Sequence, residues 1–202
     1  STNRPASFAT FLSDPSCAAT GAGHRSATTH ASTCSFAREG RLDQLHAAGT
    51  VASVKVVFVK LSDQRHTVRV ERSDGSSEAV ELDSRSFLRH DLAHVAVELE
   101  LGLFAGVWGS VARGGSLSGG GLDGADMPLA ETLSGPMQTM MRTGANATEI
   151  HEVLARIAPG VVSPDLATRL HAHVRSLAGH WAATPYGGEM VLEWPEGPVA
   201  QR

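Results

Sequence analysis

The sequence has few cysteines, few aromatic residues and no excess of positive charge. Only 2 of its 202 residues are cysteine, 5% are aromatic, and 17 Lys and Arg stand against 21 Asp and Glu. Two cysteines exclude both a disulfide scaffold and a cysteine-rich zinc cluster. A net charge of -4 argues against a nucleic-acid surface, which requires a basic excess. We therefore expect no nucleic-acid partner.

Long apolar runs are also missing. No stretch approaches the roughly 20 residues that a helix needs to span a bilayer. The N-terminus shows no basic start followed by an apolar core, the pattern of a signal peptide. Since 42% of the residues are hydrophobic and 19% are charged, the chain can build a globular core. We expect a soluble protein without a membrane partner, and we favour the cytoplasm slightly while leaving the compartment open.

The first quarter of the chain differs in composition from the rest. Residues 1–50 are rich in Ser, Thr, Ala and Gly and show no regular apolar period, which predicts an irregular N-terminal segment. Residues 51–202 are expected to form a single α+β domain. Both cysteines, Cys17 and Cys34, fall in the first segment, and they can form one disulfide or remain two free thiols.

Alternating apolar residues predict a small antiparallel sheet. Residues 54–61 are dense in β-branched side chains, and residues 66–72 and 78–82 alternate apolar with charged residues. An Asp74-Gly75 turn separates the last two. Residues 189–194 are a candidate fourth strand. The prediction is an α+β fold in which three or four antiparallel strands pack against a helical layer.

The longest expected helix follows this meander. It covers residues 85–101, with Asp83 or Ser84 as its N-cap and Gly102 as its C-cap. A break is expected in the next long helix at Gly135-Pro136. The further expected helices cover residues 105–113, 129–142, 148–158 and 164–181.

Two histidines on the helix of residues 85–101 form the main chemical signal. His90 and His94 are four positions apart, so they lie on one face about 6 Å apart along the helix axis. Both imidazoles can then reach a single ion at about 2.0–2.1 Å. Histidine nitrogens favour zinc or another late divalent metal, so we expect a zinc site at His90 and His94.

The string His90-Asp91-Leu92-Ala93-His94 resembles the His-Glu-x-x-His signature of zincin metallopeptidases, with Asp in place of Glu. The resemblance implies that His90 and His94 bind zinc and that Asp91 is the general base for the metal-bound water. Aspartate is one methylene shorter than glutamate, so its carboxylate lies about 1.5 Å further back from the metal than in that family. The resemblance covers only these five residues.

Glu98 extends the row of His90 and His94 by one more turn. It lies about 12 Å along the axis from His90, too far for one ion to bind all three residues of a straight helix. We expect Glu98 either to orient His94 or to act as a second general base. Asp91 and Glu98 are therefore the candidate catalytic residues.

A catalytic zinc site usually has a third protein ligand and an open position. The zincin resemblance implies a glutamate from a later helix, which favours Glu131 or Glu152. Spacing does not decide among the downstream candidates, which are Glu131, His151, Glu152, His171, His173 and His180.

Three functional hypotheses follow from these residues. The first is a zinc-dependent hydrolase acting on a peptide or amide, ester or phosphoester bond in a small-molecule or peptide substrate. The second is a non-catalytic, metal-stabilised domain that binds a partner through its sheet edge or its glycine-rich loop at residues 114–121. The third is a globular protein without a metal. The oligomeric state stays open.

Overall fold

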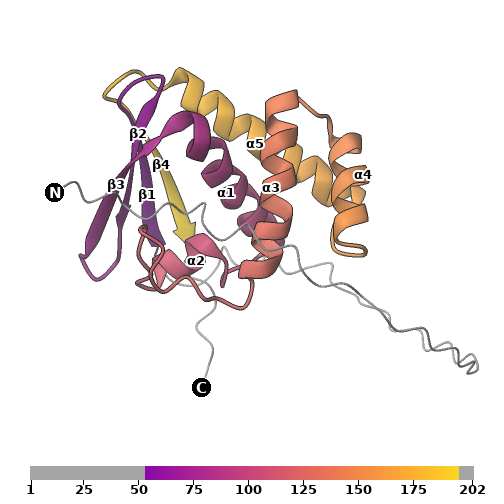
Figure 1. Ribbon diagram of the computed structural model, residues 1–202, viewed down its shortest axis with the longest axis horizontal. Helices are drawn as coiled ribbons and strands as arrows, with labels where there is room; N and C mark the ends of the chain where they lie inside the picture. The colour runs from indigo at the N-terminus through magenta and orange to yellow at the C-terminus, as the bar shows by residue number, and fades with distance from the viewer. Residues whose placement is uncertain (1–52, 196–202) are drawn as a thin grey trace, which may run out of the picture. The chain divides into compact units, whose positions relative to one another are not determined.

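The computed structural model describes residues 53–195. Its sheet consists of β1 (Ser53–Lys60), β2 (Arg65–Glu71), β3 (Ser77–Asp83) and β4 (Glu189–Pro195), in the order β3-β2-β1-β4. All neighbouring strands are antiparallel. The candidate fourth strand joins the sheet, where the structure pairs it with β1. The predicted α+β fold is confirmed, with the helices gathered on one side of the sheet (Figure 1).

Alternation in the strand sequences sets which face of the sheet is buried. In β1, Val54, Val56 and Phe58 are buried, and in β2 the same is true of Val68 and Val70. The register pairs Val56 with Val70 and Phe58 with Val68, so these side chains point to one face. The helices pack on that face.

The helix that carries the histidines begins as predicted but in two parts. The Asp83 carboxylate accepts hydrogen bonds from the backbone N–H groups of Arg85 and Ser86 and so caps a π-helical turn, η2 (Ser84–Leu88). This turn leads directly into α1 (Arg89–Leu101). Gly102 then adopts a left-handed conformation with φ of 68°, which ends the helix as expected of a glycine C-cap.

The remaining helices surround α1. They are α2 (Val107–Ala112), α3 (Met127–Thr143), α4 (Ala147–Ile157) and α5 (Pro164–Ala183). Ser163 caps α5 and Pro164 occupies its first turn, a favourable position for proline. None of the helices in residues 53–195 has the length and apolar character to cross a bilayer.

The predicted break at Gly135-Pro136 is wrong, because α3 runs through Pro136 without interruption. A proline normally disfavours helical geometry in the residue before it, in part through a clash with that residue's Cβ. The preceding residue here is Gly135, which has no Cβ and so avoids this clash. Leu133 and Met137 are both fully buried on either side of the proline, and this packing holds the two halves in one helix.

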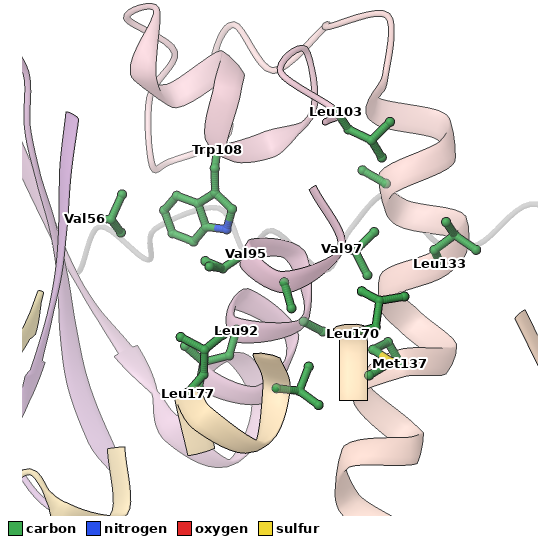
Figure 2. Close-up of a cluster of buried hydrophobic side chains, with 14 of the residues drawn as sticks. Val56, Leu92, Val95, Val97, Leu103, Trp108, Leu133, Met137, Leu170 and Leu177 are labelled. Atoms are coloured by element: carbon green, nitrogen blue, oxygen red, sulfur yellow. The ribbon is translucent and has the colours of Figure 1, made fainter. Parts of the chain in front are cut away.

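The core lies between the sheet and α1 and continues between α1 and the other helices. Figure 2 shows the indole of Trp108 lying between Val56 on the sheet side and Val95 on α1, while Leu133 and Met137 extend from α3. The Trp108 ring also packs edge to face against the Phe58 ring, with 6.0 Å between the two ring centroids. The sheet, α2, α3 and α5 surround α1. The polar residues of α1 that face α3 are therefore positioned by the packing of these neighbouring elements.

The glycine-rich loop at residues 114–121 is anchored by side chains at the end of β2 and in β3. The carboxylate of Glu78 on β3 accepts hydrogen bonds from the Ser116 hydroxyl and the Leu117 backbone N–H. Arg72 on β2 donates to the carbonyl of Gly115. These contacts hold the loop beside the turn between β2 and β3. The predicted segment of residues 1–50, with Cys17 and Cys34, lies outside the described residues.

A pair of glycine substitutions tests this packing. A Cβ on Gly109 of α2 would lie 1.9 Å from the carbonyl oxygen of Phe104, whereas one on Gly179 of α5 meets nothing within 4 Å. We expect Gly109→Ala to lower the free energy of unfolding by about 2–3 kcal/mol through overpacking. Gly179→Ala should raise it by about 0.5–1 kcal/mol because alanine is the better helix former. Urea denaturation measures both, and equal effects of the two substitutions would contradict the fold of α2.

Candidate metal centre

Three side chains from two adjacent helices form a cluster that can hold a metal ion. His90 and His94 lie on one face of α1, as their spacing predicts, and Glu131 faces them from α3. His94 is buried, while the side chains of His90 and Glu131 are 22% and 35% exposed. The cluster is therefore anchored in the core on one side and open to solvent on the other.

The distances within this cluster suit a single ion. The Nε2 atom of His94 lies 3.5 Å from Oε2 of Glu131, and the Nε2 atom of His90 lies 3.9 Å from the same oxygen. All three ligand atoms lie within 4.8 Å of one another. Tetrahedral zinc with bonds of about 2.0–2.1 Å requires ligand atoms about 3.4 Å apart. Small side-chain rotations of the partly exposed His90 and Glu131 close the difference.

The imidazole of His94 is oriented by Glu98. Its Nδ1 lies 3.0 Å from the Glu98 carboxylate, so Nδ1 carries the proton and donates it. In the neutral ring, Nε2 then holds the free lone pair. This buried atom lies 3.5 Å from Oε2 of Glu131, which is an ion-pair distance but too long for a good hydrogen bond. Nε2 of His94 therefore faces the Glu131 carboxylate across the position where an ion would lie.

Glu98 is itself fully buried and fixed by further donors. Its two carboxylate oxygens accept hydrogen bonds from the backbone N–H groups of Val107 and Trp108, each at 3.0 Å, at the start of α2. Gly106 makes this approach possible, since a Cβ there would lie 2.5 Å from the carboxylate. Gly106 has no role among the sequence-based predictions, although a glycine just before a helix is a signal for a close contact.

These contacts bear on the two roles expected for Glu98. Both oxygens are engaged, and the His94 ring separates them from the side where the three ligand atoms meet. The geometry thus gives Glu98 the role of orienting His94, which is the carboxylate–histidine–metal arrangement common at metal sites. The general-base role stays a prediction that this geometry does not favour.

Asp91 lies beside the cluster and is partly buried. Desolvation raises the pKa of its carboxyl to about 7, with the Glu131 charge adding to the rise and the His94 charge opposing it. Its backbone carbonyl accepts a hydrogen bond from the Trp108 indole N–H, which fixes this turn of α1. A carboxyl group with a pKa near neutrality can exchange a proton with a neighbouring water at pH 7.

The charge state of the ligands follows from the same contacts. Burial opposes the charged form of His94, but the adjacent carboxylates of Glu131 and Glu98 outweigh it and raise its pKa to about 9. Burial and the neighbouring His94 lower the pKa of His90. The contact with His94 lowers the pKa of Glu131. At pH 7 the cluster therefore offers an ionised Glu131, a neutral His90 and a His94 that gives up one proton to a metal.

Of the predicted candidates for a third ligand, only Glu131 joins the two histidines in the described part of the chain. His173 instead contacts Glu100 at 3.0 Å, and His171 lines a separate pocket. Sequence spacing did not distinguish Glu131 from Glu152, because the choice depends on which helix packs against α1. No protein-family model, curated protein or solved structure matches this chain.

The raised pKa of His94 predicts how metal binding depends on pH. A zinc ligand must be deprotonated, and His94 with a pKa of about 9 is protonated at pH 7, so zinc must displace its proton. We expect about one proton to be released per zinc at pH 7 and the apparent affinity to rise about tenfold per pH unit towards pH 9. Calorimetric titration in buffers of different ionisation enthalpy measures the release. Zinc binding without proton release would contradict this charge state.

A substitution of Glu98 tests its orienting role. Glu98→Gln replaces one carboxylate oxygen with an amide N–H₂, which opposes the N–H of either Val107 or Trp108. The substitution also removes the negative charge that favours the Nδ1–H donor of His94, so the orientation of His94 is weakened. We expect zinc affinity to fall about 10–100-fold, measured by competition with a chromophoric chelator. The control is Glu100→Gln on the same helix, since Glu100 contacts Arg169 and His173 instead. Equal zinc affinities for the two variants would rule out this role.

Proposed function

We propose that this protein is a zinc-dependent hydrolase that uses a metal-activated water. The observation that carries the proposal is the convergence of two histidine nitrogens and one carboxylate oxygen on one point at the edge of the core. Two histidines and one glutamate form a ligand set found in catalytic zinc sites, and three protein ligands leave one tetrahedral position for water. A structural site closes that position with a fourth protein ligand.

The donor types favour zinc over other common metals. Imidazole nitrogens suit zinc and its late divalent neighbours, whereas calcium and magnesium prefer oxygen ligands alone. The described cluster has two nitrogens and a single carboxylate. Zinc bound there would lower the pKa of a coordinated water towards neutrality and polarise the bond to be cleaved.

Asp91 is the residue we propose as the proton acceptor. It lies next to His90 in sequence, its carboxyl interacts electrostatically with His94 and Glu131, and its pKa is raised to about 7. It can take a proton from the attacking water and deliver it to the leaving group. Glu98 supports the reaction indirectly by holding the Nε2 lone pair of His94 towards the metal.

The substrate class follows from the chemistry of an activated water. A peptide or amide, an ester and a phosphoester all present an electrophilic centre with a polarisable oxygen. The local zincin resemblance at residues 90–94 favours a peptide or amide. A glutamate ligand from a later helix is compatible with that resemblance, because Glu131 lies on α3.

Hydrolysis assays on the zinc-loaded full chain test this function. A panel of peptide, ester and phosphoester substrates should show turnover that a chelator abolishes and zinc restores. Asp91→Asn should lower kcat by at least about 100-fold, the usual contribution of a general base, without loss of bound zinc. Asp123→Asn is the matched control, because Asp123 is an exposed loop residue outside the cluster.

Two results would contradict the proposal. Turnover that persists in the presence of chelator and in Asp91→Asn would exclude both the metal and the base. Stoichiometric zinc without turnover of any substrate class would favour the alternative, a metal-stabilised domain that binds a partner.

A further inference from the structure

A second site lies on another side of α1, away from the metal ligands. It is a cavity of about 460 Å³ between η2, α1, α3 and α5. This volume is within the range of about 300–1,000 Å³ that is typical of small-molecule sites. None of its lining residues is His90, His94 or Glu131, so it is distinct from the candidate metal centre.

Apolar side chains form the larger part of the wall of this cavity. Its lining includes a methionine-rich stretch of α3 together with aliphatic residues of η2, α1 and α5: Leu88, Leu92, Met137, Met140, Met141 and Val174. Methionine side chains are flexible and polarisable, and they adapt to the shape of an apolar ligand. The walls are therefore suited to a hydrocarbon chain.

The rim of the cavity is basic. Arg85 and Arg89 are one helical turn apart, and Arg175 contributes a third guanidinium from α5. All three are exposed, and among residues 53–195 none of them forms an ion pair. Asp63 also lines the cavity, but its carboxylate accepts a hydrogen bond from the Tyr186 hydroxyl at 2.6 Å. Three arginines against one aspartate leave the lining of this cavity with a net positive charge.

We propose that this cavity binds a small amphipathic anion, with its apolar chain against the methionines and its anionic head at Arg85, Arg89 and Arg175. Arginine recognises carboxylate and phosphate through paired N–H donors, and such charge-assisted hydrogen bonds are the stronger ones. An anion also relieves the repulsion between Arg85 and Arg89, which are like charges one turn apart. A carboxylate and a phosphate head share this chemistry.

Calorimetric titration of the full chain tests the proposal. The probes are dodecanoate and dodecyl phosphate, used below their micellar concentrations, with dodecanol and acetate as controls. We expect saturable one-site binding of at least one anionic amphiphile and at least tenfold weaker binding of both controls. The stronger of the two anions identifies the head group. Equal binding of dodecanol, or no binding of either anion at millimolar concentration, would overturn the proposal.

Three variants locate the site. Arg85→Gln and Arg175→Gln should each weaken binding about tenfold, since each removes a charge-assisted hydrogen bond. The matched control, Arg156→Gln on α4, should bind as the parent does, because Arg156 does not line the cavity. Ala178→Phe fills the cavity from an exposed lining position and should abolish binding while the melting temperature and zinc content stay unchanged. Retained binding in Ala178→Phe, or equal loss in Arg156→Gln, would contradict this location.

Discussion

The buried hydrogen bond between His94 and Glu98 is the interaction on which the rest of the structure depends. Removing a carboxylate from water costs several kcal/mol unless hydrogen bonds compensate. Glu98 is fully buried and receives donors from His94, Val107 and Trp108. One carboxylate thereby joins the helix of the candidate metal ligands to the start of α2, and it fixes which histidine nitrogen faces Glu131.

This constraint links the core to the candidate metal centre. Trp108 donates its backbone N–H to Glu98, donates its indole N–H to the carbonyl of Asp91 and packs on Phe58 of the sheet. The turn of α1 that carries the cluster is consequently positioned by the hydrophobic packing of the sheet. His90 and Glu131 lie on the open side and retain the freedom to adjust to an ion. A rigid histidine backed by a carboxylate, with two more adaptable ligands, is a suitable arrangement for a metal site.

Much of the fold was predictable from the sequence, because it is encoded in local patterns. The strands follow from alternation, α1 from the Asp83 and Gly102 caps, and the pairing of His90 with His94 from helical spacing. Glu131 could be chosen as the third candidate ligand only with the knowledge that α3 packs on α1. That packing is a tertiary contact between segments distant in sequence. The continuity of α3 was missed because the missing Cβ of Gly135 offsets the usual effect of Pro136. The cavity with its arginines was also beyond local patterns, since segments distant in sequence build it.

We propose that three protein ligands bind one zinc ion and leave one position for water. A crystal structure of the zinc-loaded full chain, with anomalous diffraction measured at the zinc edge, tests it most directly. The account predicts a single zinc at about 2.0–2.1 Å from the Nε2 atoms of His90 and His94, bound also by Glu131, with water as the fourth ligand. A fourth protein ligand in that position, or zinc bound elsewhere, would contradict it.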